Sequence, residues 1–343
     1  MVSLLQPVYK KLTFFCICKK FIDYLRNCVI SNSIVYNIFM KLDGTEIAKN
    51  IYTNLKNKIE TLKKKNIIPH LVVFLVGENP ASIAYVTLKQ KRGEEIGCKV
   101  TILRYETDVT TDELTEKIKL LNDDPFVHGI LIQRPLPDHI NVDKLVSTTD
   151  PKKDIDGFHS ESPFILPLPL AVGEILKYIF THTDDNSVTK KKQQKINYSI
   201  TKNSENQDFI AWLTSKKIVI IGKGQTGGGP VISYLKKLDV TPIVIDSKTI
   251  NPELITQQAD ILISATGSKN SVKAENIKKG VILISVGINR DSTNKLHGDY
   301  DETSIRSKAQ YYTPTPGGVG PVNVAMLINN LLDATVNQTI NIN

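Results

Sequence analysis

The 343-residue sequence has only four cysteines, three methionines and one tryptophan, and it has no apolar run of about 18 residues. Without such a run an ordinary membrane-spanning helix is not expected, and neither is a membrane partner. So few cysteines in so long a chain exclude a disulfide-dense secreted scaffold. Hydrophobic residues make up 41% and charged residues 23%, which excludes whole-chain disorder and collagen. The length instead predicts about two globular domains.

Acidic residues are scarce at the N-terminus, where residues 1–39 hold one acid, Asp23, against five basic residues. Half of the formal net charge of +8 lies in this segment, together with three of the four cysteines. It is Lys-rich, and it lacks the apolar core and small-residue cleavage site of a secretory signal. We interpret residues 1–39 as a disordered extension or a mis-assigned start, with organellar targeting as the alternative. Cys16 and Cys18 have no His or second Cys pair nearby, so no metal site is expected.

The body that begins at Met40 contains a single cysteine, Cys98, and cannot form an internal disulfide. That composition fits a reducing compartment, so we expect a cytoplasmic protein. Basic residues are not interleaved with aromatic residues and no nucleic-acid-binding module is recognised, so nucleic acid is not expected as a partner. The remaining positive charge suits anionic small molecules instead.

Strand and helix patterns alternate along the body, which predicts an α/β fold with mostly parallel sheets. Apolar residues at helical spacing predict a helix over 47–62, and Thr110 with Glu113 forms a capping box that begins another helix. An apolar helix is expected to run through Leu332 at the end. The expected strands are 71–76, 100–105, 129–133, 217–221, 240–245, 259–264 and 281–285. Residues 181–210 are polar and aperiodic, which predicts a long inserted loop.

A Gly-rich loop, Gly222-Lys-Gly-Gln-Thr-Gly227, follows an expected strand and precedes an expected helix. In this context Gly222 permits a tight turn, and Gly224 lets the backbone approach a pyrophosphate at the helix N-terminus. Asp246 ends the next strand, 22 residues beyond Gly224, where a dinucleotide-binding fold places its ribose contact. The sequence therefore predicts a Rossmann-like, doubly wound second domain that binds a dinucleotide.

The residues at the ribose end of this loop leave the choice of dinucleotide open. Asp246 is suited to a free 2′-hydroxyl, which favours NAD. Lys223, Ser247 and Lys248 are suited to a 2′-phosphate, which favours NADP. The Asp246 carboxylate would repel that phosphate, whereas the two lysines would attract it.

Three further segments carry candidate catalytic residues. Tyr85 and Lys89 lie four residues apart on one helix face, Gln133 ends an expected strand, and Asp156 follows Lys153-Asp-Ile. A Tyr-x-x-x-Lys pair also marks short-chain dehydrogenases, but there the Gly-rich loop comes first. Here Tyr85 comes well before the Gly-rich loop, which argues against that class.

Taken together, these segments resemble the bifunctional methylenetetrahydrofolate dehydrogenase/methenyltetrahydrofolate cyclohydrolase family. The matching segments run from Met40 to about residue 332. The most specific of them are the Tyr85/Lys89 segment and the terminal Pro316-Gly-Gly-Val-Gly-Pro321. Other matches are Gly77-Glu-Asn-Pro-Ala-Ser82, Gly129-Ile-Leu-Ile-Gln133, Lys153-Asp-Ile-Asp-Gly-Phe158 and Val286-Gly-Ile-Asn289.

The resemblance implies a two-domain homodimer with a folate-binding cleft, in which an N-terminal α/β domain adjoins the Rossmann-like domain. Such an enzyme oxidises 5,10-methylenetetrahydrofolate to the 5,10-methenyl form with NADP and hydrolyses it to 10-formyltetrahydrofolate, within one-carbon metabolism and purine biosynthesis. By resemblance, Lys89 is the catalytic lysine, Gln133 orients it, Tyr85 stacks on the folate and Asp156 anchors the pterin. The implied substrate contacts also include Pro316, Gly317, Gly318 and Pro321. The implied cofactor contacts are Gly222, Lys223, Gly224, Gly227, Asp246, Ser247 and Ile288.

We expect the folate domain to comprise residues 40–168 and 312–335, and the dinucleotide-binding domain to comprise residues 169–311 with its insertion at 181–210. The chain departs from the family pattern at Leu166-Pro-Leu-Pro169, usually Pro-Cys-Thr-Pro, and at Pro321-Val-Asn323, usually Pro-Met-Thr. Lys223 and Asp246 replace the usual Arg and His. Two alternatives therefore stay open, a dehydrogenase-only NAD-linked member and a non-catalytic folate- or nucleotide-binding protein.

Overall fold

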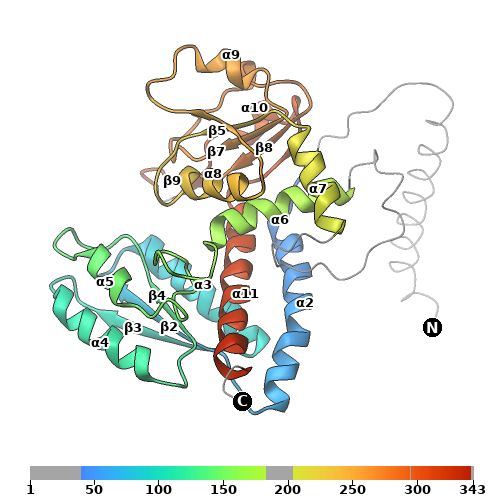
Figure 1. Ribbon diagram of the computed structural model, residues 1–343. Helices are drawn as coiled ribbons and strands as arrows, with labels where there is room; N and C mark the ends of the chain where they lie inside the picture. The colour runs from blue at the N-terminus through green and yellow to red at the C-terminus, as the bar shows by residue number, and fades with distance from the viewer. Residues whose placement is uncertain (1–39, 183–203, 294, 341–343) are drawn as a thin grey trace, which may run out of the picture. The chain divides into compact units, whose positions relative to one another are not determined.

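The computed structural model describes residues 40–182, 204–293 and 295–340 of the chain (Figure 1). The expectations for residues 1–39 lie outside this part. In chain order the first elements are β1 (Met40–Lys41), α2 (Gly44–Lys64), β2 (His70–Val76), α3 (Pro80–Ile96), β3 (Lys99–Tyr105), α4 (Thr111–Asp123), β4 (Gly129–Ile132), α5 (Val142–Thr148) and α6 (Pro167–His182).

The second half of the chain continues the alternation of helices and strands. Its elements are α7 (Ser204–Thr214), β5 (Ile218–Ile221), α8 (Gly228–Lys237), β6 (Ile243–Ile245), α9 (Pro252–Thr256), β7 (Ile261–Ser264), the 3₁₀ helix η3 (Ala274–Asn276), β8 (Val281–Ser285), β9 (Asn289–Arg290), β10 (Leu296–His297), α10 (Glu302–Ile305), β11 (Ala309–Tyr312) and α11 (Val319–Ile340).

A three-stranded parallel sheet with the order β3-β2-β4 forms the first half. Every residue of β2 is buried, as the continuous apolar run 71–76 predicts for a central strand covered on both faces. Val73 of β2 is flanked by Ile102 of β3 and Leu131 of β4. This register places the ends of β2 and β4 together, so the residue that follows β4 lies beside the end of the central strand.

Apart from the separate β9–β10 pair, the strands of the second half of the chain join β1 from its beginning in a six-stranded sheet with the order β1-β11-β8-β7-β5-β6, and all the pairings of this sheet are parallel. After β5 the chain moves outward to β6 and then returns to the other side of β5 as β7. Such a reversal of strand order opens a crevice at the carboxyl ends of the strands. The predicted α/β fold with a doubly wound parallel sheet is confirmed.

Three long helices, α2, α6 and α11, pack against one another, and α11 contacts both of the others (Figure 1). The helix α11 extends past Leu332, where the sequence pattern was expected to end, because Ala334 and Thr335 are also fully buried. The edge strand β1 pairs with β11, and the Gly44 N–H at the start of α2 donates to the Gly317 carbonyl at 2.8 Å. The start of α2 is thereby attached to the terminal Pro-Gly turn.

The polar segment 181–210 differs at both ends from the loop that its composition predicts. The helix α6 continues to His182, and α7 is already helical from Ser204. Aromatic packing accounts for the second helix, because Phe209 stacks near Trp212 and both rings lie within 6 Å of Phe180 on α6. The sequence pattern did not predict this helix because Phe180 is separated from Phe209 and Trp212 by the polar segment.

The N-terminal ends of α3 and α4 are capped by side chains that the sequence identifies. At α4 the predicted capping box is present: the Thr110 hydroxyl accepts from the Glu113 N–H at 3.2 Å, and the Glu113 carboxylate accepts from the Thr110 N–H at 2.8 Å. At α3 the Asn79 side chain accepts from the N–H groups of Ala81 and Ser82 at 3.0 and 3.1 Å. These bonds satisfy N–H groups that would otherwise have no partner in the helix.

Lys153, in the segment before Asp156, has a structural role that its sequence context did not reveal. Its side chain is buried, and its ammonium group donates to the carbonyls of Leu121, Asn122 and Asp124 at 2.7–2.8 Å. These carbonyls belong to the C-terminal end of α4, where carbonyl groups lack helical donors. A buried cation therefore holds the end of α4 against the turn that carries Asp156.

Two buried histidines join strands of the first sheet. The His128 Nδ1 accepts from the His70 N–H at 3.2 Å, and the His70 ring contacts the Phe126 carbonyl and the Thr101 hydroxyl at 3.1 and 2.9 Å. Burial lowers the pKa of His128 to about 4, with smaller contributions from the charges of His70 and Lys153. His128 is therefore neutral in the folded protein at neutral pH.

We expect this histidine to make the protein acid-sensitive. An unfolded histidine takes up a proton near pH 6.5, whereas folded His128 does so near pH 4. The free energy of unfolding should therefore fall as the pH decreases from about 6.5 to about 4, by on the order of 2 kcal/mol from this residue. Urea titrations across this range measure it. The matched variant His128→Asn keeps an acceptor at the Nδ1 position and should flatten the dependence; an equal fall in that variant would contradict the assignment.

None of the helices in the described residues combines the length and the apolar character needed to cross a membrane.

Candidate active site

One face of α3 carries the predicted Tyr-Lys pair. Residues 85, 88, 89 and 92 follow helical spacing and share this face. The Lys89 Nζ donates to the Gln133 Oε1 at 3.0 Å. Gln133 is the first residue after β4, and its N–H donates to the Phe74 carbonyl of β2. The structure thus brings Lys89 and Gln133 together at the carboxyl end of the first sheet.

The Gln133 side chain is held in one orientation by a second hydrogen bond. Its Nε2 donates to the Arg134 carbonyl at 2.6 Å, which leaves Oε1 as the acceptor that faces Lys89. The Arg134 guanidinium in turn lies 3.9 Å from the centre of the Phe158 ring. This cation–π contact connects the end of β4 to the loop that follows Asp156.

Burial and the attraction between Lys89 and Asp156 shift the pKa of each group in opposite directions. Removal from water lowers the pKa of the Lys89 ammonium, and the Asp156 charge partly offsets this fall. Burial likewise raises the pKa of Asp156, while Lys89 and Arg134 oppose the rise and Asp154 adds to it. Desolvation is the largest effect on both groups, so burial shifts Lys89 toward its neutral form and Asp156 toward its protonated form.

The turn that presents Asp156 is built by its neighbour Asp154. The buried Asp154 carboxylate accepts from the N–H groups of Gly157 and His159 at 3.2 and 2.7 Å. Gly157 has a φ of +75°, and an added Cβ would lie 2.8 Å from the Phe164 carbonyl oxygen, so glycine is required there. Sequence analysis singled out Asp156 but missed the supporting role of Asp154.

A cavity of about 320 Å³ is lined by Tyr85 and by the predicted substrate-contact residues of the Pro-Gly turn. Its walls include Tyr85, Ile288 and Arg290, followed by the turn residues Pro316, Gly317, Gly318 and Pro321. Burial raises the pKa of the Tyr85 hydroxyl, and the charge of Arg290 opposes this rise. Arg290 was not among the predicted site residues, although its position just after Val286-Gly-Ile-Asn289 was a signal that could have identified it.

Two of the departures from the family pattern line this same cavity. Leu168 comes from Leu166-Pro-Leu-Pro169 at the start of α6, and Asn323 comes from α11. The Asn323 Oδ1 is buried and has no hydrogen-bond partner among the residues that the structure describes. The altered segments therefore change the wall of the cavity rather than a remote surface.

A second cavity, of about 570 Å³, lies at the carboxyl ends of β5 and β7, where the strand order reverses. Gly222, Gly224, Asp246 and Ser247 line it. Gly222 has a φ of +89°, and a Cβ there would lie 2.7 Å from the Ala265 carbonyl oxygen. A Cβ on Gly224 would meet nothing within 4 Å, so space for a bound phosphate remains beside that backbone. These features fit a dinucleotide.

The remaining predicted cofactor residues are divided among other positions. Gly227 is the N-cap of α8, and its N–H donates to the Gly224 carbonyl at 3.2 Å. Ile288 is 43% exposed and lines the cavity beside Tyr85 rather than the cavity with Asp246. The predicted cofactor contacts are therefore divided between the two cavities.

Lys223 and Asp246, whose opposite charges left the choice of dinucleotide open, form an ion pair with each other. The Lys223 Nζ lies 2.8 Å from the Asp246 Oδ2, and the other carboxylate oxygen accepts from the Lys248 N–H and the Thr249 hydroxyl. These hydrogen bonds, the one from Lys223 foremost, lower the pKa of Asp246 to about 2. Asp246 is therefore anionic at neutral pH, and it forms an ion pair with Lys223, which would otherwise be available to a phosphate.

The fold and these sites define a two-domain α/β protein of the dinucleotide-binding class, with a second cavity beside Tyr85 on the helix that also carries Lys89. Comparison with known proteins identifies the particular family. Residues 42–156 match the catalytic domain of tetrahydrofolate dehydrogenase/cyclohydrolase, and residues 205–339 match its NAD(P)-binding domain. The chain belongs to the tetrahydrofolate dehydrogenase/cyclohydrolase family.

Relatives in this family cover most of the chain. The bifunctional protein FolD of Wolbachia pipientis wMel is 38% identical over 301 residues, which are 87% of this chain and 95% of that protein. FolD of Ligilactobacillus salivarius is 38% identical over 85% of this chain and 95% of its own. The structure of the Campylobacter jejuni FolD dehydrogenase/cyclohydrolase matches at 36% identity and a TM-score of 0.74, over 87% of this chain and 99% of that one.

A Trypanosoma brucei dehydrogenase-cyclohydrolase, solved with NADP and an inhibitor, matches at 28% identity and a TM-score of 0.73. The match covers 87% of this chain and 97% of that chain. The family resemblance that the sequence motifs indicate is confirmed by these comparisons.

Proposed function

We propose that this protein oxidises 5,10-methylenetetrahydrofolate to 5,10-methenyltetrahydrofolate with NADP, and then hydrolyses that product to 10-formyltetrahydrofolate in the same cleft. The observation that carries this proposal is the hydrogen bond from Lys89 to Gln133 on a half-buried face beside the Tyr85 cavity. Family membership supports both activities. The NADP-bound Trypanosoma brucei relative supports the choice of dinucleotide.

In the first step the residues of the cleft hold the folate in place. When bound, the dinucleotide accepts a hydride from the bridging carbon of the substrate. The roles proposed for this chain are positional: Tyr85 stacks on the aminobenzoyl ring, and Asp156 accepts hydrogen bonds from the pterin N–H groups. Because the product carries a positive charge, a neutral Lys89 avoids repelling it.

In the second step Lys89 handles the proton of the attacking water. Water forms a new C–O bond at the methenyl carbon and gives a proton to the neutral amine of Lys89. The added hydroxyl group then gives up its remaining proton as the bond from that carbon to N5 breaks and N5 takes up a proton. A formyl group remains on N10, and the proton held by Lys89 is released to solvent, so the reaction releases one proton in total. Gln133 acts as a positioning residue, because its acceptor oxygen directs the Lys89 amine.

Assays of both steps on the purified full chain test this function. We expect methenyltetrahydrofolate to be formed with NADP and then consumed without added catalyst. Formation without accelerated consumption would identify a dehydrogenase alone. If folate and nucleotide bind but neither is transformed, the protein is a non-catalytic binder. A strong preference for NAD would overturn the choice of dinucleotide.

We also propose a homodimer and a cytoplasmic location. The homodimer follows from the resemblance to the family. The location follows from the single cysteine, Cys98, in the body of the chain; this thiol is buried, and burial raises its pKa to about 12. Light scattering measures the oligomeric state. Imaging of fluorescent fusions with and without residues 1–39 tests the location.

A further inference from the structure

We propose that Lys273 binds the 2′-phosphate of NADP and is the residue of this chain that favours NADP over NAD. The inference rests on the proposed function. It concerns the cavity of about 570 Å³ at the carboxyl ends of β5 and β7, the dinucleotide cavity. Lys273 directly precedes the 3₁₀ helix η3, in the segment that follows β7. It was not among the residues that the sequence identified as cofactor contacts.

The charges that line the dinucleotide cavity leave one cation to meet an added phosphate. Among the described residues that line it, Asp246 and Glu253 are acidic and Lys273 alone is basic. Two carboxylates by themselves would repel a 2′-phosphate. Binding of NADP in this cavity therefore needs a cation, and Lys273 is the lysine that lines it.

The two lysines that the sequence offers for the 2′-phosphate do not line this cavity. Lys223 forms an ion pair with Asp246 at 2.8 Å and lines a different cavity, next to Phe158. Lys248 follows β6, but it is not among the residues that line the dinucleotide cavity. In the part of the chain that the structure describes, no ion pair joins Lys273 to a carboxylate, so its ammonium group is available to a phosphate.

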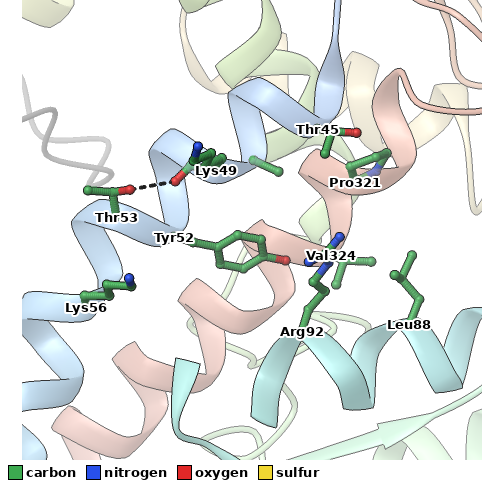
Figure 2. Close-up of a pocket in the computed structure, with 10 residues that line it drawn as sticks. Thr45, Lys49, Tyr52, Thr53, Lys56, Leu88, Arg92, Pro321 and Val324 are labelled. Carbon is green, nitrogen blue, oxygen red and sulfur yellow. Dashed lines mark hydrogen bonds between the residues drawn. The ribbon is translucent and has the colours of Figure 1, made fainter. Parts of the chain in front are cut away.

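A further group of cations lies on the folate side of the protein. Figure 2 shows Lys49, Lys56 and Arg92 around a cavity of about 270 Å³ between α2, α3 and α11. None of the described residues that line this cavity also lines the dinucleotide cavity. These three side chains are therefore not placed to meet a phosphate at the ribose end, and Lys273 remains the candidate.

The fold brings Lys273 to the part of the cavity where the ribose is expected. Asp246 and Ser247 follow β6, and α9 comes next in the chain. The Thr256 hydroxyl at the end of α9 donates to the Asn276 carbonyl at 2.5 Å, which joins α9 to η3. Because Lys273 directly precedes η3, this contact holds Lys273 and Asp246 on the walls of one cavity.

The backbone on both sides of Lys273 is fixed, although its side chain is exposed. Val272 is buried, and its N–H donates to the Asp299 carbonyl at 2.9 Å. The Lys273 carbonyl accepts from the Asn276 N–H at 3.1 Å. A lysine binds phosphate as a point charge, so a flexible stem on a fixed backbone is sufficient to place its ammonium group.

Binding of two adenosine phosphates to the full chain tests this assignment without turnover. Adenosine 2′,5′-bisphosphate and adenosine 5′-monophosphate differ only in the 2′-phosphate. In calorimetry, Lys273→Met should weaken binding of the bisphosphate about tenfold, because one charge-assisted hydrogen bond is lost, and should change binding of the monophosphate by less than about twofold. Lys273→Arg keeps the charge and should retain most of the preference.

The matched control is Lys269→Met, because Lys269 is an exposed lysine of the same segment that lines a different cavity. This variant should bind both probes as the unaltered chain does. An equal loss for both probes in Lys273→Met, no loss in that variant, or the same loss in Lys269→Met would overturn the assignment and leave the proposed function intact. A bisphosphate preference that depends on Lys273, without any turnover of methylenetetrahydrofolate, would instead overturn the proposed function and retain the assignment.

Discussion

Replacing Lys89 with methionine is expected to slow hydrolysis of methenyltetrahydrofolate by a factor of about 10²–10⁴, the range that a positioned proton acceptor contributes. Burial lowers the pKa of Lys89, and Gln133 holds its amine at 3.0 Å. Methionine has a similar length but cannot accept a proton. Hydride transfer needs alignment rather than proton removal, so the dehydrogenase step should decrease less than the hydrolase step.

Two further measurements separate proton transfer from simple disruption of the cleft. Lys89→Arg keeps a cation but cannot become neutral, so it should also lose hydrolysis. In the unaltered protein the hydrolysis rate should rise with pH as Lys89 loses its proton, and its apparent pKa should lie below that of an ordinary lysine. Lys91→Met, on the same helix, serves as the control. Substantial hydrolysis by Lys89→Met would refute the assignment.

Asp246→Asn is expected to increase the selectivity for NADP over NAD by up to about 100-fold, because the substitution should improve the binding of NADP and weaken the binding of NAD. The substitution removes the anion that would face a 2′-phosphate. It also releases Lys223, whose ammonium lies 2.8 Å from that carboxylate, to contact the phosphate. At the same time NAD loses a carboxylate acceptor for its 2′-hydroxyl.

The ratio of kcat/KM for the two dinucleotides measures this change. Asp208→Asn removes one exposed carboxylate on α7 with the same change in shape, and it should leave the ratio unaltered. Lys223→Met should lower NADP use in the Asp246→Asn background. An unchanged ratio in Asp246→Asn would show that the pair does not contact the ribose end of the dinucleotide.

Elements with strong local signals were predictable from the sequence. The apolar run that forms β2 and the capping box at Thr110 depend on neighbouring residues, and both occur as expected. The sharp turn at Gly222 was predictable for the same reason, since only a residue without a Cβ fits its φ of +89° beside Ala265. Helix α7 was missed because its stabilising partner, Phe180, lies beyond a polar segment.

The sites show the same division between local and long-range information. Tyr85 and Lys89 could be paired from helical spacing, and Gln133 could be placed at the end of a strand. The Lys89–Gln133 hydrogen bond joins residues 44 positions apart, and the three carbonyls that bind Lys153 lie 29 to 32 positions away. The spacing of residues within one segment cannot predict a contact between residues so far apart in the sequence.

The sequence by itself determined the α/β class, the dinucleotide loop and the family of this protein, because each depends on residue types at fixed local spacing. Only the tertiary structure decided that Lys223 pairs with Asp246 and that Asn323 lines the cavity beside Tyr85. Charge and hydrogen-bond energies depend on separation and burial in space, and packing of distant segments sets both.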